Sequence, residues 1–359
     1  MKNYLKELNK KVLPQNYFFP PKWIVLGVNN VCNLHCKMCD VGTNNLESNF
    51  AKNLVGTHPI NMPLELIKKI IDQTAQYYPQ TKLGYGFTEP LVYPHLIESL
   101  KYANTKKLFT TITTNALTLK HKAKDLIDAG LNELYISLDG PQDIHNEIRG
   151  HKKSFQKALE GIEELLKYKN PPTISIFCVI TEWNIGYLKE FASFFKKYPL
   201  KHLGFMHTNF TPPEIAVIHN KIWKDLYPAT DSNIDEIAIE NMDLNVLWNE
   251  IDAIRNDNFP FQVSFSPEIK SKELLDIFYL NPEIQVGKKC NDIFNNIMIK
   301  SDGSVIPAHG RCYNLDIGNI YNSDLKQIWQ SSILKKIRVD LQKAGGLFPA
   351  CSRCCSISY

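Results

Sequence analysis

The sequence predicts an α/β fold: a partial (β/α)6 TIM-like barrel followed by a small C-terminal α+β domain. Strand-like and helix-like segments alternate through the first two-thirds of the 359 residues, polar motifs follow several predicted strands, and five of the nine cysteines gather near the C-terminus. Such alternation is typical of parallel βαβ units, whose right-handed crossovers curl into a barrel. We expect an N-terminal extension (1–21), the barrel (22–210), a helical connecting region (211–287) and the C-terminal domain (288–359).

The predicted elements follow the order of successive βα units. Short apolar or β-branched runs predict strands at 22–28, 82–86, 108–113, 133–138, 173–180 and 202–206. Apolar residues at helical spacing predict helices at 63–77, 93–103, 117–128, 154–167 and 185–197. Farther along we expect helical pieces at 216–226 and 245–255, a hairpin at 297–307 around Asp302-Gly303, and one helix at 324–341.

The composition excludes several classes of function. Hydrophobic residues make up 44% of the chain and charged residues 22%, which argues against extensive disorder. A net charge of +4 is too small, in a chain of this length, to indicate nucleic-acid or anionic-membrane binding. The sequence contains neither a continuous apolar stretch long enough to span a membrane nor a signal peptide. We therefore expect a cytoplasmic protein without nucleic-acid or membrane partners.

The clustered cysteines indicate metal binding, because thiols stay reduced in the cytoplasm and an odd number argues against a complete disulfide framework. Cys32, Cys36 and Cys39 form a C-x3-C-x2-C motif soon after the first strand. Three thiolates can hold three irons of a [4Fe–4S] cluster and leave the fourth open. The alternative is a zinc knuckle completed by His35, which this spacing suits poorly. Cys178 lies within an apolar strand and is expected to be a core residue.

The cysteine spacing and its place after the first strand resemble the radical S-adenosylmethionine (SAM) superfamily, although Met38 stands where many members have an aromatic residue. The resemblance implies that SAM chelates the open iron. It further implies reductive cleavage to a 5′-deoxyadenosyl radical, which abstracts a hydrogen from the substrate. The electron would come from a low-potential donor such as flavodoxin or ferredoxin, and iron–sulfur clusters reach about −700 mV.

Later strand ends resemble the SAM-binding segments of that family. Gly86–Pro90 is similar to its Gly-Gly-Glu-Pro segment but lacks the two glycines, and residues 113–115 are similar to Thr-Asn-Gly, with Ala116 in the glycine position. The run SLDGPQDIHNEIRG at 137–150 is also family-like. Taken singly, each could be an ordinary turn or helix cap. The resemblance implies SAM contacts from Thr88, Glu89, Asn115, Ser137 and Arg149, with Arg149 pairing the SAM carboxylate.

The C-terminal block resembles the SPASM or twitch extension of radical SAM enzymes. Cys290 and Cys312 flank the predicted hairpin, and the tail contains Cys351-x2-Cys354. The resemblance implies one ligand-saturated auxiliary [4Fe–4S] cluster, held by these four thiolates, that accepts an electron or orients substrate. Cys355 could replace Cys354. The competing interpretation is a zinc ribbon.

The substrate is expected at the barrel mouth, between SAM and the tail. His207 and His309 are candidates for proton transfer, because histidine titrates near neutral pH; further candidates for substrate contact are Tyr85, Asn209 and Arg311. The leading hypothesis is radical modification of a peptide or protein side chain. The alternatives are a dehydrogenase or epimerase of a small molecule, such as a sugar or aminocyclitol, and a non-catalytic zinc-binding protein.

Overall fold

The structure is a computed structural model that describes residues 2–358. Its main element is a ten-stranded sheet in the order β11-β10-β9-β1-β2-β3-β4-β5-β6-β7. Neighbouring strands from β1 to β7 pair in parallel, and their chain order is their order in the sheet. These strands are β1 (Trp23–Leu26), β2 (Lys82–Tyr85), β3 (Thr110–Thr114), β4 (Glu133–Ser137), β5 (Thr173–Ile180), β6 (His202–His207) and β7 (Gln262–Ser266).

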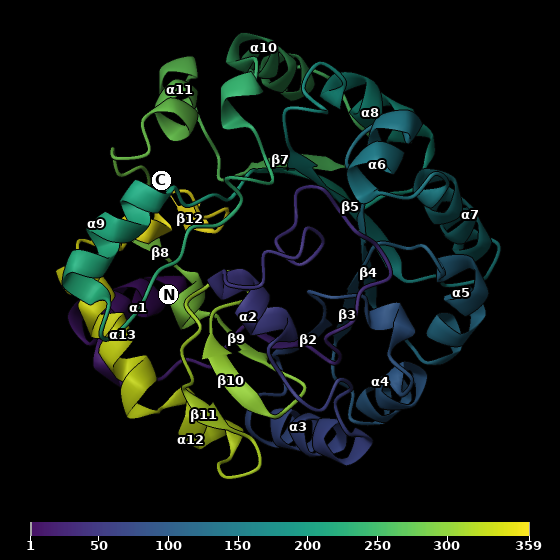
Figure 1. Ribbon diagram of the computed structural model, residues 1–359. Helices are drawn as coiled ribbons and strands as arrows, with labels where there is room; N and C mark the ends of the chain where they lie inside the picture. The colour runs from purple at the N-terminus through teal and green to yellow at the C-terminus, as the bar shows by residue number, and fades with distance from the viewer. Residues whose placement is uncertain (1, 359) are drawn as a thin grey trace.

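Helices cover the outer face of the curved sheet, as Figure 1 shows, so the predicted α/β fold class is confirmed. They alternate with the strands because each amphipathic helix buries one apolar face against the sheet. The barrel-side helices are α3 (Leu64–Tyr77), α4 (Leu96–Thr105), α5 (Leu119–Asp128), α6 (Gln142–Arg149), α7 (Ser154–Leu166), α8 (Leu188–Phe194) and α10 (Leu244–Arg255). The others are α1 (Lys2–Val12), α2 (Asn49–Val55), α9 (Pro213–Trp223), α11 (Lys272–Leu280), α12 (Leu325–Trp329) and α13 (Ser332–Lys343).

The C-terminal hairpin extends the barrel sheet. Its strands are β9 (Asn296–Ile299) and β10 (Ser304–Pro307), followed by β11 (Gly318–Asn319). β9 pairs in parallel with β1, so β1 has a barrel strand on one side and a C-terminal strand on the other. A second, two-stranded sheet joins β8 (Lys289–Cys290) to β12 (Ile357–Ser358).

Several elements differ from the sequence prediction. Region 211–287 contains β7 as well as helices, because a short strand within a long helical stretch has little periodic signal. The short helix α6 was not predicted. The single helix predicted at 324–341 is two helices, because Asp324 caps α12 with a capping box and the Ser331 side chain caps α13 at Leu334.

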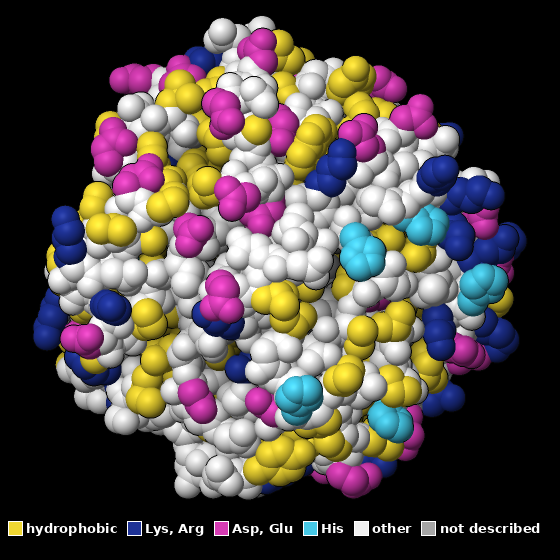
Figure 2. Space-filling view, viewed as in Figure 1, with side chains coloured by type: hydrophobic (Ala, Val, Ile, Leu, Met, Phe, Trp, Pro, Cys, Tyr) yellow, Lys and Arg dark blue, Asp and Glu magenta, His cyan; other side chains and the backbone are white. Residues whose placement is uncertain are grey.

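Side chains within the barrel strands alternate between the barrel interior and the helical layer. On β6, Met206 faces the interior, while Phe205 and His207 pack outward against aromatic side chains. None of the helices within residues 2–358 is long and apolar enough to cross a membrane. Figure 2 shows Lys and Arg gathered mainly over α5 and α7 on this face, with Asp and Glu interspersed.

Candidate functional site

A pocket of about 390 Å³ lies at the carboxyl ends of the parallel strands. Its wall includes inward-facing residues of six strands, among them Val25, Thr113 and Met206. Cys32, Cys36 and Cys39 all line it. The five predicted SAM contacts line it too: Thr88, Glu89, Asn115, Ser137 and Arg149. The topology thus gathers into one cavity groups that are more than a hundred residues apart in sequence.

The cysteine loop is closed tightly by glycine. A Cβ at Gly42 would lie 2.5 Å from the Cys36 carbonyl oxygen and 2.7 Å from its nitrogen, so no larger residue fits. The Lys37 amide donates to the Ile148 carbonyl at 2.8 Å and ties the loop to α6. Burial raises the pKa of Cys36 to about 11 and also raises the pKa of Cys32. A metal that binds these thiols must displace their protons.

Glu89 is a buried carboxylate that holds the neighbouring strand end. It accepts hydrogen bonds from the Thr114 hydroxyl at 2.7 Å, the Asn115 amide at 2.8 Å and the Leu91 amide at 2.9 Å. Burial raises the pKa of Glu89 despite these bonds. Asn115 donates to the Asn33 side chain at 2.8 Å, within the cysteine loop. The segment with Glu89 therefore positions the next motif as well as lining the pocket.

In the two segments that resemble glycine-containing family motifs, a residue other than glycine adopts a positive φ. Phe87 has a φ of +80° and Ala116 has a φ of +61°, both in the left-handed region. They belong to the two segments in which the sequence resemblance expects glycines. This conformation costs about 1–2 kcal/mol for each L-residue.

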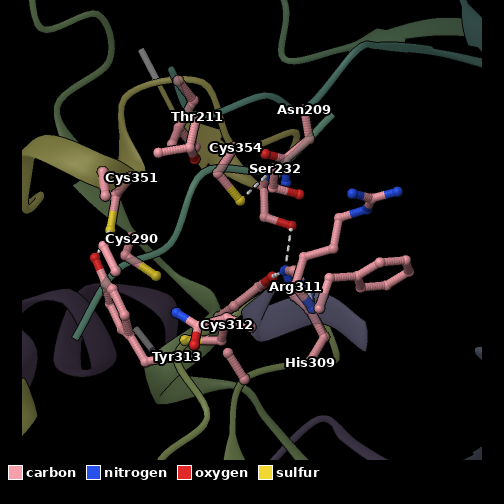
Figure 3. Close-up of a pocket in the computed structure, with 18 of the residues that line it drawn as sticks. Asn209, Thr211, Ser232, Cys290, His309, Arg311, Cys312, Tyr313, Cys351 and Cys354 are labelled. Atoms are coloured by element: carbon pink, nitrogen blue, oxygen red, sulfur yellow. Dashed lines mark hydrogen bonds and ion pairs between the residues drawn. The ribbon is translucent and has the colours of Figure 1, made fainter. Parts of the chain in front are cut away.

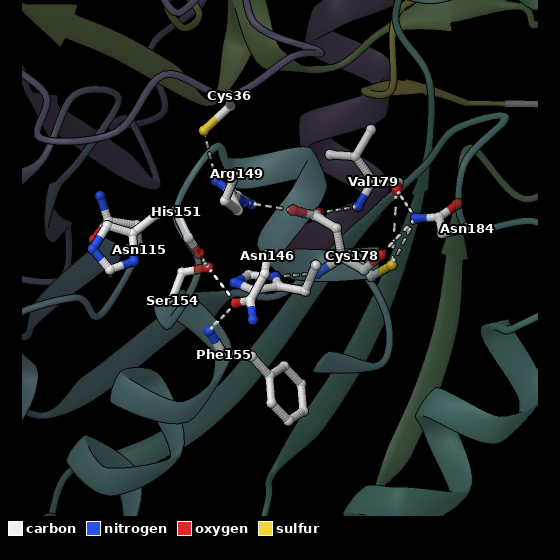
Figure 4. Close-up of polar contacts among 12 residues, drawn as sticks. Cys36, Asn115, Asn146, Arg149, His151, Ser154, Phe155, Cys178, Val179 and Asn184 are labelled. Atoms are coloured by element: carbon white, nitrogen blue, oxygen red, sulfur yellow. Dashed lines mark hydrogen bonds and ion pairs between the residues drawn. The ribbon is translucent and has the colours of Figure 1, made fainter. Parts of the chain in front are cut away.

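Arg149 is held by Asp139 at the edge of the same pocket, and Figure 4 shows its guanidinium directed toward the Cys36 sulfur. Its Nε lies 2.5 Å from Asp139 Oδ2, and its Nη1 lies 3.6 Å from Cys36 Sγ. The other carboxylate oxygen of Asp139 accepts from the Val179 amide at 3.0 Å. Burial opposes the charge on Arg149, but Asp139 and Cys36 together raise its pKa, so the guanidinium stays charged.

A second cavity, of about 80 Å³, lies between the C-terminal hairpin and the tail. Cys290, Cys312, Cys351 and Cys354 all line it, and Figure 3 shows their sulfurs around a common space. The antiparallel pairing of β8 with β12 aligns Cys290 with Ile357 and brings the tail to the hairpin. Burial raises the pKa of Cys290 and of Cys312. Asp292 and then Cys351 add to the shift of Cys290, whereas Cys290 and Cys351 add to that of Cys312.

The two cavities adjoin at Arg311, which lines both. Its guanidinium stacks 4.0 Å from the ring centroid of Phe50. In the same region, the His309 ring stacks on Phe87, a residue of the first pocket, with centroids 6.3 Å apart. Burial disfavours a charge on His309, but Asp292, 3.3 Å from its Nε2, raises its pKa. The residues between the two cysteine groups thus present a cation, an imidazole and aromatic surfaces.

The donor sets fit iron–sulfur clusters. The first cavity offers three thiols and the second offers four, which are the ligand numbers of an open and a saturated cluster. Within residues 2–358, no three His, Cys, Asp or Glu side chains converge tightly enough to hold a single metal ion. The fit of these cysteines to iron–sulfur clusters is therefore inferred from which residues line each cavity.

Family models match both parts of the chain. The Radical SAM superfamily matches residues 27–195, and the SPASM iron-sulfur cluster-binding domain matches residues 290–355. The protein is a radical SAM enzyme with a SPASM domain. Its cofactors are accordingly SAM, a [4Fe–4S] cluster and auxiliary iron–sulfur binding in the C-terminal domain.

Similar proteins include modifying and maturating enzymes. The chain is 24% identical over 357 residues to the tungsten-containing aldehyde ferredoxin oxidoreductase cofactor-modifying protein of Pyrococcus furiosus, covering 93% of this chain and 87% of that protein. It is 30% identical over 201 residues to the serine-type anaerobic sulfatase-maturating enzyme of Bacteroides thetaiotaomicron, covering 52% and 46%.

Solved structures share the fold of this radical SAM enzyme. SuiB of Streptococcus suis, bound to precursor peptide SuiA, has a TM-score of 0.62 at 16% identity, over 94% of this chain and 70% of that one. The enzyme anSMEcpe with bound AdoMet has a TM-score of 0.58 at 20% identity, over 88% and 82%.

The structure corrects one substrate-site prediction for this radical SAM enzyme. His207 faces outward from β6, and its Nδ1 lies 2.9 Å from the Tyr279 hydroxyl, so it is a core residue that lines neither cavity. Burial lowers the pKa of His207 to about 3. Tyr85 is among the residues that line the first cavity, and its hydroxyl lies 3.1 Å from the Ser99 hydroxyl on α4. Strand alternation decides the case of His207, because residues next to inward-facing ones point the other way.

The structure also locates the other residues considered near the two cavities. His309 and Asn209 line the second cavity, and Arg311 lines both. Cys178 is fully buried, as predicted. Asn184 donates to the Asp139 carbonyl at 2.9 Å and to the Val179 carbonyl at 2.7 Å, so it ties two strand ends together.

Sequence reasoning missed several residues of the radical SAM site. Phe50 on α2 lines the second cavity, and Asn53 on the same helix donates to the Cys312 carbonyl at 2.7 Å. Tyr313 contacts Cys351, its hydroxyl 3.2 Å from Sγ. The position of Tyr313 directly after a predicted ligand was the one available signal. Phe50 gave none, because its site is formed by contacts distant in sequence.

Proposed function

We propose that this enzyme modifies a peptide or protein side chain by SAM-dependent hydrogen abstraction. Cys32, Cys36 and Cys39 hold the SAM-binding cluster, which supplies the electron that cleaves SAM when both are bound. The carrying observation is that these three cysteines and the predicted SAM contacts line one cavity that adjoins the auxiliary cysteines.

The SAM-binding residues surround the cluster side of the pocket. Thr88, Glu89, Asn115, Ser137 and Arg149 contact SAM in this proposal, with Glu89 and the carbonyls of its segment favouring the cationic amino group. The Arg149 guanidinium bonds Asp139 through Nε and lies near Cys36 Sγ through Nη1, so in this proposal its Nη2 donors bind the SAM carboxylate.

Cys290, Cys312, Cys351 and Cys354 hold one auxiliary [4Fe–4S] cluster in this proposal. Cys354 is preferred to Cys355 because it lines the cavity. In the metal-free pair, however, a hydrogen bond from the Cys354 thiol lowers the pKa of Cys355. The auxiliary cluster would accept an electron from the substrate radical or orient substrate, and flavodoxin or ferredoxin would reduce the SAM-binding cluster.

Substrate would bind where the two cavities adjoin. Arg311 and His309 lie there, next to Phe87. In this proposal His309 accepts or returns a proton. Its ring lines the second cavity, its Nε2 lies 3.3 Å from Asp292, and its Nδ1 accepts from the Arg311 amide at 3.1 Å. A peptide substrate is supported by the shared fold with SuiB, which was crystallised with a precursor peptide.

A small-molecule substrate is the second candidate. The similarity to a cofactor-modifying protein extends over 93% of this chain, farther than that to the sulfatase-maturating enzyme. A dehydrogenase or epimerase reaction on a cofactor precursor or sugar would use the same two cavities.

Anaerobic reconstitution tests the proposal. The protein should bind about eight irons per chain, and the Cys32→Ala/Cys36→Ala/Cys39→Ala variant about four. With dithionite, the native protein should cleave SAM to 5′-deoxyadenosine and the triple variant should not. A peptide that accelerates this cleavage and gains or loses mass would support the first candidate. Zinc without iron, or no SAM cleavage, would refute the proposal.

A further inference from the structure

The Tyr313 side chain lines the second cavity and contacts one of its cysteine sulfurs. Its hydroxyl oxygen lies 3.2 Å from Cys351 Sγ, and the side chain is 7% exposed. Figure 3 shows the ring beside Cys290 and Cys312, with its hydroxyl directed toward Cys351. In the metal-free chain either atom could donate. A cysteine that binds iron is a thiolate without a proton, so the hydroxyl must then be the donor.

We propose that Tyr313 donates a hydrogen bond to the Cys351 ligand and thereby raises the reduction potential of the auxiliary cluster. This inference rests on the ligand set proposed above. Hydrogen bonds to cluster sulfurs are among the features that set cluster potentials. A donor stabilises the reduced cluster more than the oxidised one, because the reduced cluster carries one more negative charge. A higher potential makes the cluster a better acceptor of an electron from substrate.

The region 211–287 holds the Tyr313 ring in this position. His219 on α9 stacks on the ring, with centroids 5.2 Å apart and an interplanar angle of 23°. The His219 Nε2 lies 2.7 Å from the Tyr227 carbonyl, which fixes the plane of the imidazole. Phe348 packs edge-on against the Tyr313 ring, and its carbonyl accepts from the Cys351 amide at 2.9 Å. The same contacts therefore position both the hydroxyl and the sulfur.

This geometry gives the connecting region a role in the auxiliary site. α9 contributes no predicted ligand, yet it positions the group that touches one. Tyr313 is thus a positioning and tuning residue, which acts through Cys351 and not by direct contact with substrate.

Tyr313→Phe removes the hydroxyl and keeps the ring, and its effect can be measured as a potential. The measurement uses full-length reconstituted protein carrying Cys32→Ala, Cys36→Ala and Cys39→Ala, so that the auxiliary cluster alone is observed by redox titration with electron paramagnetic resonance. We expect the midpoint potential to fall in Tyr313→Phe. A tenfold change in the one-electron equilibrium would correspond to a shift of about 59 mV.

Tyr227→Phe is the matched control. Tyr227 lies in the same aromatic cluster, 6.1 Å from Tyr313, but its hydroxyl donates to Asp340 at 2.8 Å. Its removal should leave the potential unchanged.

The possible outcomes distinguish the proposed ligand set of the auxiliary cluster from the proposed role of Tyr313. Four irons per chain in all three proteins, with a potential lowered only by Tyr313→Phe, supports the inference. Four irons with equal potentials, or an equal shift in both variants, refutes the role of Tyr313 alone. A triple-cysteine background without iron refutes the ligand assignment and the inference together.

Discussion

Asp139→Asn removes the negative charge that faces the Arg149 guanidinium inside the protein. Asp139 is fully buried, and its Oδ2 lies 2.5 Å from Arg149 Nε. An asparagine can still accept from the Val179 amide, so the loss is mainly that of the charge. Removing one partner of a buried ion pair costs about 3–5 kcal/mol. Because the Arg149 side chain is still 10% exposed, we expect a loss at the lower end of this range. The free energy of unfolding should fall by about 3 kcal/mol, which is about a hundredfold in the folded-to-unfolded ratio.

Urea unfolding of the reconstituted protein measures this cost, with Asp128→Asn as the control. Asp128 pairs with Lys124 on the surface of α5, where the side chains are 50% and 65% exposed. Surface pairs contribute about 0–1 kcal/mol. The midpoint should therefore fall much farther for Asp139→Asn than for Asp128→Asn at equal slope.

A double-mutant cycle completes the test. Arg149→Met removes the cation, so the double variant Asp139→Asn/Arg149→Met no longer buries an unpaired charge. It should be more stable than the sum of the two single losses predicts, by about 1–3 kcal/mol. Equal losses for Asp139→Asn and Asp128→Asn, or strict additivity in the cycle, would show that this ion pair does not stabilise the strand ends as described.

Three further predictions concern backbone strain, a buried histidine and the fourth ligand. Ala116→Gly should leave the free energy of unfolding nearly unchanged, because relief of the left-handed conformation offsets the lost methyl group. Ala123→Gly, within helix α5, should lower it by about 2 kcal/mol. Equal urea midpoints for the two variants would contradict this. Because the pKa of His207 is lowered to about 3, the unfolded chain binds a proton near pH 6.5 that the folded chain does not, so stability falls as pH drops below about 6.5. His207→Phe should therefore lose less stability than the native protein between pH 7.5 and 5.5, and equal losses would refute the burial argument. Cys354→Ser should lose about four irons per chain and Cys355→Ser none; the reverse iron contents would assign Cys355 as the ligand.

The sequence by itself determined the first six barrel strands in their order and the two cysteine groups. Both depend on local features: β-branched runs and helical spacing for the strands and helices, and close spacing for Cys32, Cys36 and Cys39. The polar motifs at strand ends could also be placed together, because parallel strands bring their carboxyl ends to one edge. This is why the five predicted SAM contacts line a single pocket.

Only the tertiary structure decided which neighbouring groups face that pocket. Strand parity turns Met206 inward and His207 outward, although the two are adjacent in sequence. Pairing of β9 with β1 joins the C-terminal hairpin to the barrel and places Arg311 between the cavities. The contacts around Tyr313 come from α9, far away in the chain. Such arrangements depend on the packing of segments that are distant in the chain, and local sequence patterns do not predict that packing.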